Sequence, residues 1–216
     1  MLEVSTTACD VRSLIFYAEH YVGWIAIGLG NDLRSGMAMP ARIDSVDLAI
    51  WRSASGAVHA WGDRCPHRGM RLSQGFVRGE TLSCIYHGWQ YDSDGGCSYI
   101  PAHPDLVPPK SICATTYDCI ESGGLIWVEL NAPTSKPPLL PDAAALRSLQ
   151  IAAPVDDVAT FLEATDQSVI DTGDAVVVLQ PTDKASCMIH VLARQNPKQT
   201  SRWAETLRKQ IEEQAA

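Results

Sequence analysis

Short apolar runs separated by turn residues make up the chain as far as about residue 130. The runs are rich in Val, Ile, Trp and Tyr and cover residues 21–29, 46–52, 58–62, 81–84, 112–117 and 125–129. Segments rich in Gly, Ser and Asp lie between them, at 53–56, 78–80, 92–96 and 121–124. This alternation is typical of antiparallel strands joined by tight turns. It predicts an all-β domain, preceded by a short helix over 11–20.

A proline-rich segment separates this part from the rest of the chain. Residues 131–141 contain four prolines, which favour extended backbone and remove hydrogen-bond donors. After them, 174–180 and 186–194 are predicted strands joined by a turn at 181–184. Residues 201–214 are a predicted helix with Trp203, Leu207 and Ile211 on one face. We therefore expect a domain over 1–130, a linker over 131–141 and a small α+β piece over 142–216. So small a piece must pack on the first domain or on another chain.

The composition is that of an ordinary globular protein. The 216 residues are 46% hydrophobic and 19% charged, which suits one core plus a small appendage. No apolar run reaches the eighteen residues of a membrane span, and residues 1–7 lack the features of a secretion signal. A cytoplasmic location is expected. The net charge of −8 argues against nucleic acid or an anionic membrane surface as partner.

Two short segments each pair one cysteine with one histidine. Cys65 and His67 belong to the first, Cys84 and His87 to the second, with sixteen residues between His67 and Cys84. This is the ligand pattern of a Rieske [2Fe–2S] centre, in which two histidines replace two cysteines on one iron. With neutral imidazoles the oxidised cluster carries no net charge, whereas four thiolates leave it at minus two. The Rieske cluster therefore accepts an electron more easily, and the pattern predicts electron transfer.

A structural zinc site is the alternative for the same residue types. Zinc sites usually combine Cys-x(2–4)-Cys with His-x(3–5)-His, whereas here each segment offers one thiol and one imidazole. In both segments a glycine, Gly69 or Gly88, follows soon after the histidine and allows the backbone to turn close to the sulfides. The spacing favours the iron–sulfur cluster.

The segments around these ligands show a resemblance to a known family. Residues 15–130 resemble the N-terminal domain of the Rieske non-haem iron oxygenases. The likeness rests on the runs at 61–69 (WGDRCPHRG), 72–75 (LSQG) and 86–92 (YHGWQYD), and on Gly95-Gly96. It implies a Rieske-type antiparallel β-sandwich and a [2Fe–2S] cluster held by Cys65, His67, Cys84 and His87. Respiratory Rieske proteins have a disulfide where this chain has Met70 and Tyr86, so the resemblance implies the low-potential type.

The C-terminal piece departs from that family. A complete oxygenase would add a helix-grip domain with a mononuclear iron on two histidines and one carboxylate. Of the six histidines, His190 alone follows the linker, so no mononuclear iron is expected. The family's Asp-x2-His-x4-His motif has its spacing at Asp166, Val169 and Asp174, with both histidine places empty. On that alignment the piece is a truncated remnant of the helix-grip domain.

Three functions are compatible with these features. The first is the Rieske electron-transfer subunit of a multicomponent oxygenase, which takes electrons from a reductase or ferredoxin and passes them to an iron on a triad-bearing oxygenase chain in a hetero-oligomer. On this hypothesis the chain is not catalytic alone. The second is a free-standing Rieske ferredoxin, against which the long C-terminal extension argues. The third is a non-catalytic scaffold or redox-sensing subunit.

Overall fold

The computed structural model describes residues 23–131, 135–164 and 168–215. The helix expected over 11–20 lies outside the described residues. Within them the chain forms two compact units. The first contains Leu33–Ala41 and Asp47–Cys119, and the second contains Gly23–Asp32, Arg42–Val46 and the chain from Ile120 onwards.

The first unit is built from short antiparallel strands. Strand β3 (Val46–Arg52) pairs with β4 (Val58–Gly62), and β4 pairs with the start of β9 (Thr116–Ser122). A separate four-stranded sheet has the order β5-β6-β7-β8. Its strands are Phe76–Arg78, Thr81–Ser83, Gln90–Tyr91 and Cys97–Tyr99. One core lies under both sheets and includes Trp51, Trp61, Leu72, Leu82 and Tyr91. Strand β2 (Ala38–Ile43) begins in this unit.

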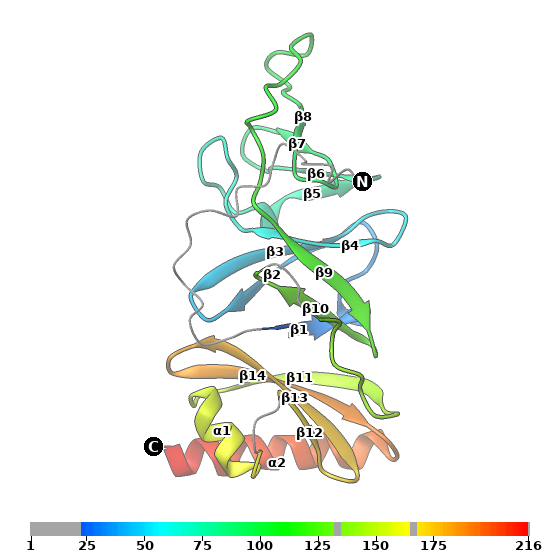
Figure 1. The fold of residues 1–216 in the computed structure, drawn as a ribbon, viewed down its shortest axis with the longest axis vertical. Helices are drawn as coiled ribbons and strands as arrows, with labels where there is room; N and C mark the ends of the chain where they lie inside the picture. The colour runs from blue at the N-terminus through cyan, green and yellow to red at the C-terminus, as the bar shows by residue number, and fades with distance from the viewer. Residues whose placement is uncertain (1–22, 132–134, 165–167, 216) are drawn as a thin grey trace, which may run out of the picture. The chain divides into compact units, whose positions relative to one another are not determined.

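The second unit is a four-stranded antiparallel sheet covered on both faces. Its order is β11-β14-β13-β12. The strands are Ala144–Ile151, Ser186–Ala193, Ala175–Asp183 and Val169–Asp171. One face packs on α1 (Val155–Phe161) and α2 (Pro197–Ala215), which Figure 1 shows on the same side of the sheet. The other face packs on β1 (Ile25–Leu29) and β10 (Leu125–Glu129), which pair with each other. Because β13 is covered on both faces, its first seven residues are all buried.

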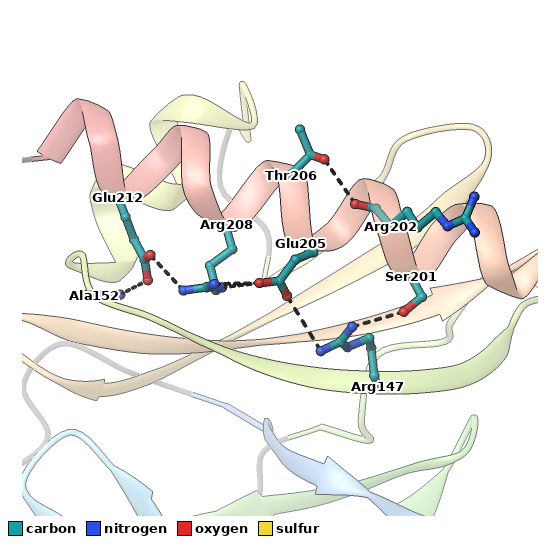
Figure 2. Close-up of polar contacts among 8 residues, drawn as sticks. All are labelled: Arg147, Ala152, Ser201, Arg202, Glu205, Thr206, Arg208 and Glu212. Atoms are coloured by element: carbon teal, nitrogen blue, oxygen red, sulfur yellow. Dashed lines mark hydrogen bonds and ion pairs between the residues drawn. The ribbon is translucent and has the colours of Figure 1, made fainter.

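Helix α2 is held to the sheet by an apolar face and by ion pairs beside it. Thr200, Ala204, Leu207 and Ile211 recur at helical spacing and are buried. Beside them, Glu205 pairs with both Arg208 and Arg147 of β11. Glu212 pairs with Arg208 and accepts a hydrogen bond from the backbone N–H of Ala152 (Figure 2). The helix therefore has a fixed rotation on β11.

The structure confirms the mainly β class and corrects the C-terminal elements. Two strands and one helix were expected there, whereas the described residues after the proline-rich segment form four strands and two helices. Pro181 belongs to β13 instead of to the predicted turn. It lies opposite Cys187, beside an irregularity between Pro181 and Asp183, where a missing backbone donor is tolerated.

The compact units do not run along the chain in the order of the expected domains. β1 and β10 precede the proline-rich segment in sequence, yet both belong to the second unit. A unit that is compact in space need not be a continuous domain of the sequence. The division into 1–130, 131–141 and 142–216 therefore remains a prediction. Among the described residues no helix is long and apolar enough to span a membrane.

Candidate metal centre

Two loops with the same backbone design carry the four predicted ligands. In the first loop the N–H of Cys65 donates to the carbonyl of Met70 and the N–H of Gly69 to that of Cys65, both at 2.8 Å. In the second loop the N–H of Cys84 donates to Trp89 at 2.9 Å and that of Gly88 to Cys84 at 3.0 Å. Each loop turns at its glycine, where φ is +69° and +70°. Side chains other than glycine rarely adopt such a conformation, which explains the two glycines of the sequence pattern.

The loops place their thiols inside the unit. Cys65 and Cys84 are only 3% and 2% exposed and belong to the core under the small sheet. Burial raises the pKa of the Cys84 thiol, and the backbone amides of Tyr86 and His87 act in the opposite direction. Such amides stabilise a thiolate, which is the form that binds iron.

The imidazoles lie on the outer side of the same loops. The ring centroids of His67 and His87 are 4.7 Å apart, with an angle of 65° between the ring planes. His67 is half-buried and His87 is exposed. Burial, followed by the nearby His87 and Arg68, lowers the pKa of His67. The neutral ring that results is the form that ligates a metal.

A buried carboxylate closes the base of the first loop. The side chain of Asp63 is fully buried. It accepts hydrogen bonds from the N–H of Ser73 at 2.7 Å, from the Ser73 hydroxyl at 2.8 Å and from the Arg71 guanidinium at 3.1 Å. Arg71 also pairs with Asp47. Residues 63 and 73 flank the loop, so these bonds tie its two ends together.

Asp63 and Tyr91 lie in the motifs that carry the resemblance, but no role was predicted for either from the sequence. The Tyr91 hydroxyl lies 3.1 Å from the Cys65 sulfur. Its ring meets Trp61 edge to face, with centroids 6.4 Å apart. Trp61 is therefore a core residue, while Trp89 stacks on His67. Only the three-dimensional structure identifies these three contacts, because the residues of each pair lie more than twenty positions apart in sequence.

The remaining candidates lie away from these loops or outside the described residues. His190 is buried in β14 and its ring nitrogens contact Ser148 and Gln180. Asp166 is not among the described residues, while Val169 belongs to β12. In the described part of the chain, no three His, Cys, Asp or Glu side chains converge on a single point. A two-iron cluster needs no such point, because each iron takes two protein ligands.

The donor set fits a two-iron cluster. Two buried thiols face inwards, and two imidazoles in contact with each other face outwards from the same pair of loops. This matches one iron on cysteines inside and one iron on histidines outside.

Comparison with known proteins agrees with this interpretation. Residues 23–117 match the model of the Rieske [2Fe-2S] domain. Oxidoreductase NdmD of Pseudomonas putida is 38% identical over 157 residues, which are 68% of this chain and 27% of that protein. The 4beta-methylsterol monooxygenase of Methylococcus capsulatus is 38% identical over 109 residues, 49% of this chain and 29% of that protein. This chain thus spans less than a third of the length of these relatives.

The fold likeness extends past the matched domain. The crystal structure of apo dicamba monooxygenase superposes with a TM-score of 0.73 at 19% identity, and the match covers 89% of this chain and 84% of that one. NdmB of Pseudomonas putida CBB5 gives a TM-score of 0.70 at 20% identity, covering 88% and 81%. Shares of this size exceed residues 23–117, so they include elements of the second unit.

Fold and site together define an iron–sulfur protein of the Rieske class. Residues 23–117 match the Rieske [2Fe-2S] domain, which supports an electron-transfer role. The chain is a homologue of the Rieske non-haem iron oxygenases.

Proposed function

We propose that this chain is the electron-transfer component of a multicomponent Rieske oxygenase. Cys65 and Cys84 hold the inner iron of the cluster and His67 and His87 the outer one. The observation that carries the proposal is the pair of equivalent loops with buried thiols and outward-facing imidazoles. When bound, the cluster would accept and release one electron at a time. The protein buries the two thiols, favours the neutral form of His67 and leaves His87 exposed to a partner.

The proposed partners follow from what the second unit contains. Its only histidine in the described residues is His190, which is buried and held by neighbouring side chains. We propose that the mononuclear iron belongs to a separate oxygenase chain with an intact two-histidine, one-carboxylate site, in a hetero-oligomer. A reductase or ferredoxin supplies the electrons. The location we propose is the reducing cytoplasm, where thiols such as the buried Cys65, Cys84 and Cys187 stay reduced.

The first experiment tests the cluster. The purified chain should contain two irons and two labile sulfides and, when reduced, give the rhombic electron paramagnetic resonance (EPR) signal of a histidine-ligated cluster. Replacing Cys65, His67, Cys84 or His87 should abolish or severely damage it. Cys187→Ala is the matched control, because Cys187 is a buried thiol of the second unit. Stoichiometric zinc without sulfide would refute the proposal.

The second experiment tests the direction of electron flow. The chain, a reductase and a triad-bearing oxygenase are assayed singly and in combination, and co-expression tests for a stable complex. Substrate oxidation should need all three. Robust turnover by this chain alone, with a third iron per protomer, would contradict the assignment.

The second candidate function is a free-standing Rieske ferredoxin, which carries electrons to the oxygenase. The observation that favours it is the 38% identity with NdmD, which is described as an oxidoreductase. In that case the chain would reduce the oxygenase by diffusional encounter. A dilution experiment distinguishes the two candidate functions. The rate of electron transfer to the oxygenase should fall on dilution for a diffusing ferredoxin and stay constant for a component of a stable complex.

A further inference from the structure

The two loops are each closed by hydrogen bonds that run within the loop. Of the four backbone hydrogen bonds described above, two lie within residues 65–70 of the first loop and two within residues 84–89 of the second. A cluster shared by both loops needs a fixed distance and orientation between them as well. Contacts that cross from one loop to the other can fix this distance and orientation.

Trp89 makes one of these contacts. Its indole lies against the imidazole of His67, with ring centroids 4.1 Å apart and planes only 7° from parallel. At the same time its backbone carbonyl accepts the hydrogen bond that closes its own loop, and its side chain packs on the core of the unit. The residue thus joins the second loop, the core and a predicted ligand of the first loop.

The geometry of this stack leaves the His67 ring nitrogens accessible for binding a metal. The nitrogens of an imidazole bond within the plane of the ring, whereas the indole covers a face. His87 approaches the same imidazole at 65°, so His67 is confined between an indole on its face and the second predicted ligand. Rotation of the His67 ring would separate the stacked faces and lose their contact, which aromatic pairs gain beyond simple burial.

We propose that Trp89 is a positioning residue that locks the His67 ring in the orientation for binding the outer iron and shields that side of the cluster from water. This rests on the assignment of His67 as a ligand. Loss of the indole should let the ring rotate and admit water. Water stabilises the more highly charged, reduced cluster, so the midpoint potential should rise.

The test compares Trp89→Leu with Trp89→Phe in the full-length chain. Trp89→Leu should release iron to a chelator roughly 3–10-fold faster, shift the midpoint potential upwards and broaden the EPR signal. Trp89→Phe keeps an aromatic face and should stay close to the wild-type protein in all three. Trp203→Leu, in α2 of the second unit, controls for loss of a half-buried tryptophan. It should lower the melting temperature without changing the three cluster measurements.

Each outcome decides the proposal. If Trp89→Leu assembles no cluster while Trp89→Phe does, the need for an aromatic ring is supported. If Trp89→Leu matches the wild-type protein, or if both variants are equally damaged, the positioning role is refuted. A wild-type protein with no histidine-ligated cluster would refute the ligand assignment itself, a result distinct from either.

Discussion

The hydroxyl oxygen of Tyr91 lies 3.1 Å from the sulfur of Cys65, in the buried core beneath the two loops. Burial, followed by the contact with Cys65, raises the pKa of Tyr91, so the phenol stays protonated. A cysteine bound to iron is a thiolate and can only accept a hydrogen bond. With the cluster bound, Tyr91 would then be the donor and the Cys65 thiolate the acceptor.

Replacing Tyr91 with Phe should lower the midpoint potential. The hydrogen bond stabilises the reduced cluster more than the oxidised one, because the reduced cluster places more negative charge on its thiolates. With about 1–1.5 kcal/mol of differential stabilisation, the expected fall is about 40–60 mV. Protein-film voltammetry measures it directly.

Tyr117→Phe is the control for this experiment. Tyr117 is half-buried, and burial raises its pKa, but it lies on β9 opposite Ala60. Its variant should keep the wild-type potential. An unchanged potential in Tyr91→Phe with an intact EPR signal would mean that the hydroxyl does not donate to the cluster.

The absolute potential should lie near the low end of the Rieske range, at about −150 mV. The positions that hold the bridging cysteines of high-potential proteins are occupied by Met70, which is half-buried, and Tyr86, which is 59% exposed. A strongly positive midpoint at neutral pH would contradict this expectation and would indicate that hydrogen bonds such as that of Tyr91 outweigh the missing bridge.

Asp63→Asn should destabilise the first loop. The amide NH₂ would face the Ser73 hydroxyl and the Arg71 guanidinium, both of which are donors in the wild-type contacts. Leaving buried polar groups without partners costs about 2–3 kcal/mol, a fall in melting temperature of roughly 5–10 °C for a protein of this size. Circular dichroism melts measure it.

Asp94→Asn provides the comparison for Asp63. Asp94 is exposed and accepts one bond, from the N–H of Gly96, which an asparagine oxygen retains. Its effect should stay within about 0.5 kcal/mol. Equal effects of the two substitutions would mean that the buried carboxylate does not tie the loop.

The sequence predicted the elements before the proline-rich segment better than those after it, for a physical reason. Strands β3, β4 and β10 begin and end at the expected residues, because each is a compact apolar run between turn residues. Strand β11 was missed because its residues 144–151 mix Arg147, Ser148 and Gln150 with apolar positions, and only Leu149 and Ile151 of the strand are buried. The start of α2 was missed although Asn196 and Pro197 form a capping pair, with the Asn196 side chain accepting from Gln199.

The candidate site shows the same division between local and distant information. The four predicted ligands are recognisable because their spacing is local, and the cluster type follows from their chemistry. The contacts of Asp63, Tyr91 and Trp89 depend on how separate segments meet. Asp63 and Ser73 are ten residues apart in sequence, and Tyr91 and Cys65 are twenty-six apart. A single sequence carries no information on contacts at such separations.

The second unit should lose stability in acid through His190. Its Nδ1 lies 2.8 Å from the Ser148 hydroxyl, and its Nε2 lies 3.0 Å from Oε1 of Gln180 and 3.3 Å from the carbonyl of Ala26. A neutral ring that donates from Nε2 and accepts at Nδ1 satisfies these partners. Burial lowers the pKa of His190 from 6.5 to about 4.

The sign of the pH effect follows from that shift. Above pH 6.5 the histidine is neutral in both the folded and the unfolded chain, so its full contribution is present. Between pH 6.5 and 4 only the unfolded chain takes up the proton, and stability falls by about 3 kcal/mol. Below pH 4 both states are protonated and the loss levels off. His190→Gln cannot titrate, so the stability difference between wild type and variant should shrink over this window, whereas His103→Gln, on an exposed loop, should keep the wild-type slope. Parallel stability curves for wild type and His190→Gln between pH 7 and pH 4 would show that the ring is not held neutral in the fold.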